Sequence, residues 1–161
     1  MRRGWLLVPA LLAAPAVARD VVGVWGAWGA FRDPGRCYAI ARPEGVARRD
    51  AARRPFASVG TWPARGQRNS LHVRLSRERD RSAPVTLSIG ERRFPLVATG
   101  TDAWAPDLAA ERAAVGAMRS GRAMSVDAVA RGGRPFSDVY RLDGAASAID
   151  AAALACLAAR R

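Results

Sequence analysis

The stretch VTLSIGERRFPLVA, residues 85–98, carries the clearest local signal in the chain. Apolar residues alternate with polar ones before the pair Gly90-Glu91 and again after it, which is typical of strands that bury one face. Glycine at the first central position favours a two-residue type II′ turn, a connection that joins antiparallel strands. We therefore predict a β-hairpin here. Its alternating apolar positions are Val85, Leu87, Ile89, Phe94, Leu96 and Ala98.

Strand-like segments also fill the chain on the N-terminal side of this hairpin. Residues 22–31 are rich in strand-forming residues, and a turn sequence at 33–35 precedes a second strand that begins at Cys37. Two further strands are predicted over 56–62 and 70–76, the second with apolar and polar residues in alternation.

Trp25 and Trp28 lie within the first of these segments. If one strand carried both, their odd spacing would direct them to opposite faces of the sheet, so one would be exposed. A second packing layer or a bulge at Gly26 would bury both. An exposed tryptophan would instead offer an aromatic contact surface to a partner.

The hydrophobic period changes on the C-terminal side of the hairpin. Apolar residues recur at helical spacing over 107–119, acidic residues occupy the first turn, and Gly121 follows the end, so we predict a short helix. Strands are predicted around 124–128 and 139–142, with a turn between them. A final helix carries Cys156 on one apolar stripe.

About eight short strands and two helices favour an antiparallel β-sandwich or a small barrel. An α+β roll, in which both helices cover one open sheet, is the alternative. The length of 161 residues suits one domain of ordinary size. Half of the residues are hydrophobic and a quarter are charged, which excludes a disordered or low-complexity chain.

Residues 1–18 have the pattern of a secretory signal peptide. Two arginines form a cationic start, residues 5–14 form an apolar run, and residues 16–18 read Ala-Val-Ala, a small-residue cleavage site. We predict cleavage after Ala18, which leaves residues 19–161 as a single domain in the periplasm or outside the cell. The apolar run is too short to span a membrane. A membrane-anchored or cytosolic N-terminal helix is the alternative.

Cys37 and Cys156 are the only cysteines. With a single histidine and no Cys-x-x-Cys motif, the sequence contains neither a zinc ligand set nor a thioredoxin-like redox motif. In an oxidising compartment we predict one disulfide between the two cysteines. The alternative is two separately buried thiols. We expect no metal and no cofactor.

All 26 basic residues are arginines, and they outnumber the 14 acidic residues to give a formal charge of +12. Arginine is dense in two segments, 42–54 and 74–81, which define a candidate patch for an anionic partner such as lipopolysaccharide or an acidic polysaccharide. Export would separate the chain from nucleic acid, and codon bias alone would also explain the arginine content. The patch residues are Arg48, Arg49, Arg53, Arg54, Arg74, Arg77, Arg79 and Arg81.

The sequence contains no phosphate-binding loop, dinucleotide fingerprint or calcium loop. His72 lies in an alternating strand on the face opposite the leucines, which indicates a solvent-facing position rather than a catalytic one. Carboxylates among so many arginines are expected to form ion pairs rather than an acid-base pair. We therefore predict that the protein is not an enzyme. The carboxylates considered for acid-base chemistry are Asp102, Asp127, Asp138 and Asp143.

An ordered series of short motifs runs through the C-terminal half. It comprises Ile89-Gly90, Phe94-Pro95-Leu96, Asp102-Ala103-Trp104, AMRSG at 117–121, MSV at 124–126, Arg131-Gly132, DVYRLDG at 138–144, and Cys156. In order and spacing this series resembles the invasion-associated locus B (IalB) family, with a looser match at Trp28, Cys37 and 56–59.

The resemblance implies a secreted or periplasmic β-sandwich of the immunoglobulin-like type, without known catalytic residues or cofactor. From the signal-like segment, the strand count and this pattern we predict that the protein acts by binding a protein or a cell-surface component. A cationic binder of anionic envelope polymers such as lipopolysaccharide is the alternative. Gly133 and Arg141 depart from the family pattern, in which threonine and serine are common, so an inherited binding surface is not assumed.

The residues of the family pattern have structural explanations. We expect core contacts, a helix end at Gly121 and a turn into the last helix at Gly144. The pattern residues expected to define the fold are Trp104, Met118, Gly121, Arg131, Gly132, Asp138, Tyr140 and Gly144.

Overall fold

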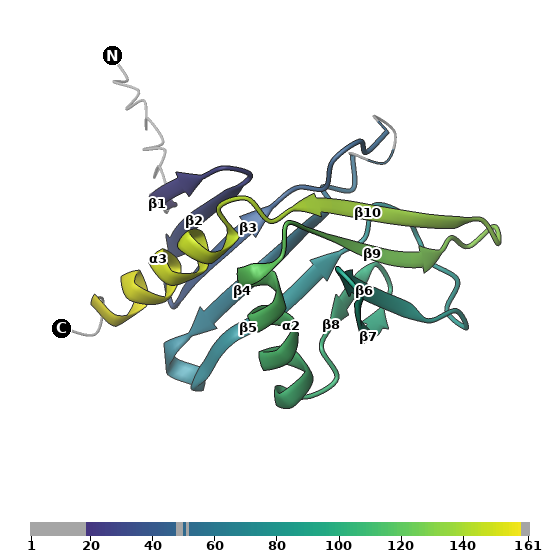
Figure 1. The fold of residues 1–161 in the computed structure, drawn as a ribbon. Coiled ribbons are helices and arrows are strands. Elements are labelled where there is room, and N and C mark those ends of the chain that lie inside the picture. Colours follow the sequence, from purple (N-terminus) through teal and green to yellow (C-terminus); the bar gives the residue numbers. More distant parts are fainter. Residues whose placement is uncertain (1–18, 48–49, 51, 159–161) are drawn as a thin grey trace, which may run out of the picture.

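The computed structural model describes residues 19–47, 50 and 52–158 (Figure 1). The predicted signal peptide, residues 1–18, lies outside the described residues. The elements of the described part are β1 (Asp20–Trp25), β2 (Trp28–Asp33), β3 (Arg36–Ala41), β4 (Phe56–Trp62), the 3-10 turn η1 (Pro63–Arg65), β5 (Gln67–Arg74), β6 (Val85–Ile89), β7 (Arg92–Thr99), β8 (Asp102–Trp104), α2 (Leu108–Ser120), β9 (Ala123–Val129), β10 (Pro135–Arg141) and α3 (Ala145–Ala158).

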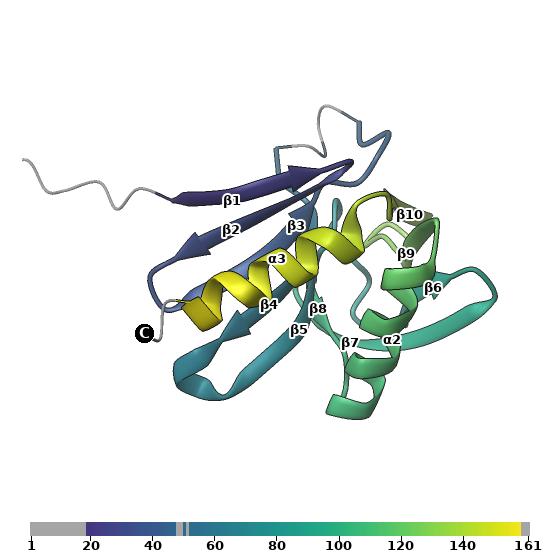
Figure 2. The same cartoon turned by 60° about the vertical axis from the view of Figure 1, so that its left-hand side comes forward.

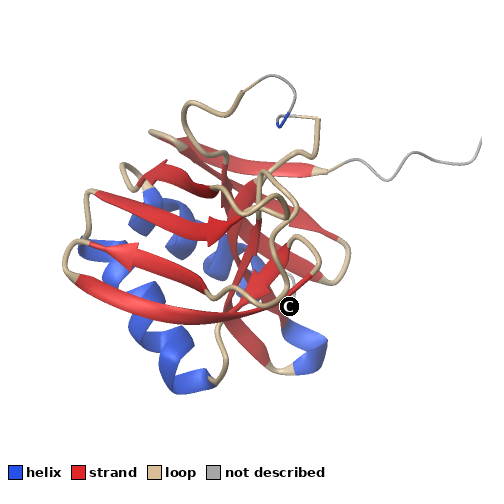
Figure 3. Ribbon diagram, turned by 90° about the vertical axis from the view of Figure 1, so that its right-hand side faces the viewer, coloured by secondary structure: helices blue, strands red, loops and turns tan. Residues whose placement is uncertain are grey.

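These strands form one antiparallel sheet in the order β1-β2-β3-β4-β5-β8-β7-β6-β9-β10. Strand β7 divides the sheet, because residues 92–96 pair with β6 whereas residues 97–99 pair with β8. The sheet therefore has two halves that are joined by β7. The first half consists of β1 to β5 and β8, and the second half consists of β6, β9 and β10. The second half faces the viewer in Figure 3.

The two helices pack against the first half of the sheet and against each other (Figure 2). Helix α3 lies along β1 to β4, and α2 packs on β5, where Glu111 accepts a hydrogen bond of 3.0 Å from the backbone N–H of Leu71. Asp107 caps α2 by accepting from the N–H of Ala110 at 2.8 Å. The predicted fold class is confirmed: the chain is mainly antiparallel β structure with one internal and one C-terminal helix, consistent with a β-sandwich.

The hairpin predicted over residues 85–98 is present. Ile89 lies opposite Arg92, and Gly90 has a φ of 58°, which the first central position of a type II′ turn requires. Apolar residues of both halves and of both helices share one core. The largest fully buried side chains are Trp28, Tyr140, Leu71, Leu75, Leu87, Met118, Met124, Ile149, Val73, Val126 and Cys37.

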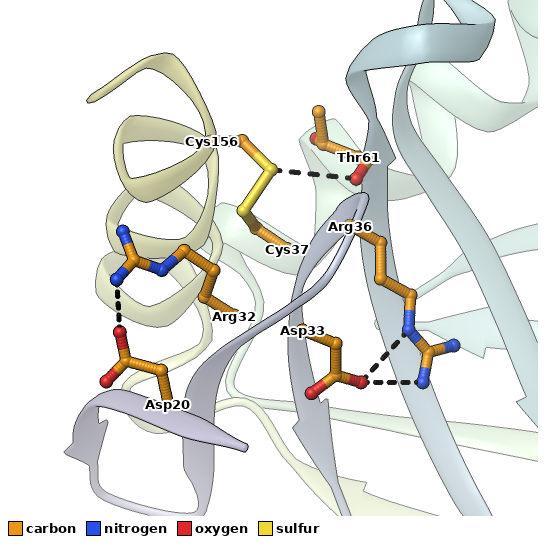
Figure 4. Close-up of a disulfide and its surroundings, with 7 residues drawn as sticks. All are labelled: Asp20, Arg32, Asp33, Arg36, Cys37, Thr61 and Cys156. Atoms are coloured by element: carbon orange, nitrogen blue, oxygen red, sulfur yellow. Dashed lines mark hydrogen bonds and ion pairs between the residues drawn. A yellow bond between two sulfur atoms is a disulfide. The ribbon is translucent and has the colours of Figure 1, made fainter. Parts of the chain in front are cut away.

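The predicted disulfide between Cys37 and Cys156 is also confirmed (Figure 4). It joins β3 to the last turns of α3, with a Cα–Cα distance of 5.7 Å and a sequence separation of 119. Cys156 Sγ lies 3.8 Å from the carbonyl oxygen of Thr61, so the bond sits against β4 as well. The last helix is thus covalently fixed to the sheet near the start of the chain.

The expectation for Trp25 and Trp28 is wrong, because the two residues lie on different strands. A two-residue turn at Gly26-Ala27 separates β1 from β2 and places the tryptophans directly opposite one another, on the same face. Trp28 is fully buried and donates a hydrogen bond of 2.8 Å from Nε1 to the carbonyl of Arg141. Both indoles therefore contribute to the core.

Strand β8 is an addition to the elements that the sequence predicts. It contains three residues, too few for an alternating pattern to be visible. Ala103 takes the buried position, and Trp104 therefore points to the outer face, where 37% of it is exposed. The predicted core contact of Trp104 is wrong for this reason.

Removal of the disulfide should destabilise the fold strongly. For a loop of this length, chain entropy assigns roughly 4 to 5 kcal/mol to the cross-link. We expect the variant with Cys37→Ala and Cys156→Ala to lose a free energy of unfolding of that order in urea denaturation. Reduced wild-type protein is the control and should lose a similar amount. A loss below about 1 kcal/mol in both would contradict the prediction.

Candidate functional site

A cleft of about 740 Å³ opens where four connecting segments converge. These segments are the loop before β4, the β5–β6 loop, the β7–β8 turn and the β9–β10 turn. We call it the arginine cleft. Its lining residues are Arg53, Glu78, Arg79, Asp80, Arg81, Gly100, Thr101 and Arg131.

Backbone hydrogen bonds fix one wall of the arginine cleft. The N–H of Asp80 donates to the carbonyl of Val129 at 2.8 Å, and the N–H of Arg131 donates to the carbonyl of Glu78 at 3.0 Å. These bonds extend the end of β9 into the β5–β6 loop. The arginines of two distant segments are therefore held in a defined relation to each other.

Arg79 is the fixed charge of the arginine cleft. Its guanidinium donates to the carbonyls of Asp80, Arg81 and Ala83 at 2.9 to 3.3 Å, and to the carbonyl of Ala98 at 2.7 Å. Within the described part of the chain it forms no ion pair with a carboxylate, and its buried Nε lacks an acceptor. Four peptide carbonyls therefore surround its positive charge, which also attracts the neighbouring Asp80 carboxylate.

The two carboxylates of the arginine cleft are engaged differently. Glu78 contacts both Arg53 and Arg131, each at 3.4 Å. Asp80 instead accepts hydrogen bonds from the hydroxyl and the backbone N–H of Ser82, and these bonds hold the pKa of Asp80 below its usual value. Four guanidinium groups against two carboxylates leave two excess positive charges.

The structure separates the arginines of the predicted patch. The arginine cleft brings together Arg53, Arg79 and Arg81. It also contains Arg131, which was predicted only to help define the fold. The β9–β10 turn reaches this position only through non-local strand pairing, so no local signal could have placed it there.

The other arginines of the predicted patch lie elsewhere. Arg77 pairs with Asp50 at 3.0 Å, and Arg74 pairs with Asp102 at 3.1 Å on the outer face of the sheet. Arg54 lines a separate pocket with Arg42. Arg48 and Arg49 lie outside the described residues.

His72 lies on the outer face of β5, opposite to the buried Leu71 and Val73, as the alternation predicted. Its Nε2 lies 2.7 Å from Asp102 Oδ1, and its ring stacks on Trp104 with a centroid distance of 5.1 Å. These contacts tie β5 to the short strand β8.

Ser58 lies opposite His72 on the neighbouring strand, but the two side chains do not form a nucleophile and base pair. The Ser58 hydroxyl donates to the backbone carbonyl of His72 at 3.4 Å. The arrangement around His72 is therefore a cross-strand packing cluster.

The carboxylates considered for acid-base chemistry each have partners of their own. Asp102 contacts His72 and Arg74, as described above. Asp127 accepts hydrogen bonds from the hydroxyls of two serines, and Asp143 pairs with Arg141 at 3.2 Å. Within the described ranges no cluster of three or more metal-ligating side chains occurs, and no helix there is long and apolar enough to cross a membrane.

Asp138 is the buried carboxylate of the fold, with 2% of the residue exposed. It accepts a hydrogen bond of 2.8 Å from the backbone N–H of Ser76, which links β10 to the segment after β5. Burial raises the pKa of Asp138 above its usual value because the charged form loses hydration. This contact supports β10, the strand that follows the β9–β10 turn at the arginine cleft.

The remaining pattern residues occupy structural positions. Met118 and Tyr140 are fully buried, and Gly121 ends α2 where a Cβ would press on Ile89. Gly144 has a φ of 82° and lies against the backbone of Trp25, so only glycine fits there. Gly132 lies in the β9–β10 turn.

Comparison of the chain with protein-family models, with curated proteins and with solved structures finds no match. The resemblance to the invasion-associated locus B family therefore stays a prediction from the residues of the sequence.

The raised pKa of Asp138 predicts a pH dependence of stability. A carboxyl whose pKa is higher in the folded state than in the unfolded state binds protons preferentially when folded, so its stabilising effect is present below the unfolded pKa and is lost as the pH rises. Asp138→Asn keeps an oxygen acceptor for Ser76 but does not titrate. We expect the free energy of unfolding of this variant, relative to wild type, to increase from pH 4 to pH 7.

Urea denaturation at several pH values measures this difference. Asp143→Asn, at an exposed carboxylate near the end of the same strand, is the control for removal of one negative charge. A relative stability of Asp138→Asn that falls as the pH rises would contradict the assignment.

Proposed function

We propose that the protein is an exported, non-enzymatic protein of the invasion-associated locus B type, which acts by binding a protein or a cell-surface component. The signal-like sequence of residues 1–18 supports export. The disulfide fits an oxidising compartment, the periplasm or the outside of the cell. The order of motifs in the C-terminal half supports the family.

The arginine cleft is the observation that carries the binding function. It combines positive charge, hydrogen-bond donors and a wall fixed by backbone pairing, and together these properties suit recognition of an anionic group. Cross-strand packing and ion pairing account for the other candidate groups, His72 and the outer arginine Arg74.

A cationic binder of anionic envelope polymers, such as lipopolysaccharide, is the second candidate. The two excess positive charges of the arginine cleft favour it. The guanidinium of Arg81 makes no hydrogen bond or ion pair in the described ranges, so it is available to an anion.

Export can be tested on the chain expressed with its own N-terminus in a bacterium. We expect protein from the cell envelope or the medium to have an intact mass that begins at Arg19, because the small-residue site precedes it. An uncleaved chain in the cytoplasm would contradict the exported function and bring nucleic acid back as a partner.

Binding to lipopolysaccharide distinguishes the two candidate functions. If charge dominates, binding of the mature protein should weaken steeply from low to physiological salt, since screening shortens the range of the attraction. Arg81→Ala should weaken binding several-fold, while Arg112→Ala, which removes an exposed arginine of α2, should leave it unchanged. Salt-independent binding, or equal loss in both variants, would count against the anionic partner.

A further inference from the structure

The geometry points to a sugar phosphate as the ligand of the arginine cleft: a phosphomonoester bound by Arg53, Arg81 and Arg131, with its saccharide in the remaining space. This inference rests on the proposed binding of an anionic envelope component and names the chemical group that is recognised.

The charge of the arginine cleft matches a phosphomonoester. The cleft has two excess positive charges, and a phosphomonoester carries about 1.5 to 2 negative charges at neutral pH. A sulfate ester or a carboxylate carries only one. Of these three groups, the phosphomonoester has the charge that most nearly balances the site.

The available arginines carry the hydrogen-bond donors that suit phosphate. Guanidinium groups present planar forks of N–H donors that bind phosphate oxygens in a bidentate manner. Arg81 is free of carboxylate partners in the described ranges, and Arg131 is 82% exposed at its side chain. Both can turn toward a ligand without disrupting the core.

Glu78 does not prevent this binding. Its contacts with Arg53 and Arg131 are long, at 3.4 Å, and about half of its side chain is exposed. Exposed ion pairs of this kind contribute little to stability, so a phosphate can replace Glu78 as the partner of both arginines.

Arg79 supplies a positive charge whose side chain is already fixed before a ligand binds. Four backbone carbonyls hold its guanidinium in place, and in the described ranges it forms no ion pair with a carboxylate that a ligand would have to displace. A preformed charge costs no side-chain entropy when an anion binds, whereas a mobile arginine does. The site is thus partly organised before the ligand arrives.

The volume and the two acids argue for a phosphate on a sugar rather than for inorganic phosphate. At about 740 Å³ the arginine cleft is in the range of small-molecule sites and much larger than one phosphate group. Glu78 and Asp80 offer carboxylate oxygens that can accept hydrogen bonds from the hydroxyls of a sugar. The hydroxyl of Thr101 adds a further polar group to the lining.

Isothermal titration calorimetry of the mature protein with glucose 1-phosphate tests the proposal. We expect this probe to bind at least about tenfold more tightly than glucose, glucose 6-sulfate or inorganic phosphate. Arg81→Ala and Arg131→Ala should each weaken it about fivefold or more, and Arg112→Ala should change it less than twofold. Equal affinity for glucose 6-sulfate, or equal loss in Arg112→Ala, would overturn the phosphomonoester assignment.

Lipopolysaccharide before and after enzymatic dephosphorylation separates a lipid-linked phosphate from a free one. Loss of binding on dephosphorylation supports a lipid-linked sugar phosphate, and binding of glucose 1-phosphate alone supports a free one. Salt-sensitive binding that survives dephosphorylation, without binding of glucose 1-phosphate, overturns this inference and leaves the anionic function standing. If neither form of lipopolysaccharide binds and no sugar phosphate binds, the sugar-phosphate inference and the anionic-polymer function both fail.

Discussion

Helix α3 is held on the sheet at both of its ends, and the arrangement of the first half depends on this. At its N-terminal end, Gly144 lies against the backbone of Trp25, and the N–H of Ala27 donates to the carbonyl of Asp143 at 3.1 Å. At the other end, the disulfide fixes it to β3. The helix consists largely of alanine, whose small side chains allow close approach but supply little buried area each. The fixed ends add to the limited stabilisation that these small side chains provide between the helix and the sheet.

The arginine cleft lies in loops, and its order comes from the sheet beneath them. Strand β7 crosses between the two halves, so its turn into β8 lies next to the β5–β6 loop. Pairing of Asp80 with the end of β9 then brings in the β9–β10 turn. A rigid scaffold with functional side chains on its loops is a common division of labour in β-sandwich proteins.

Local signals in the sequence predicted much of the fold. The alternation around Gly90 and the helical spacing over 107–119 each act over a few residues, and both elements are present. The turn at Gly26-Ala27 was missed because strand-forming residues on both sides obscure it. For the arginine cleft, the sequence predicted a patch that includes Arg79 and Arg81 but not Arg131. The proximity of Arg131 to the β5–β6 loop depends on pairing across about fifty residues. Non-local contacts of this kind leave no trace in a periodic pattern.

The disulfide also changes the topology of the chain. Because Cys37 is bonded to Cys156, the backbone between them is a closed covalent ring. Every connection from the β3–β4 loop to the start of α3 lies on that ring, the four segments of the arginine cleft included. A protease that cuts once anywhere on the ring opens it without releasing a fragment. A single cut between Cys37 and Cys156 thus leaves all of the strands covalently attached.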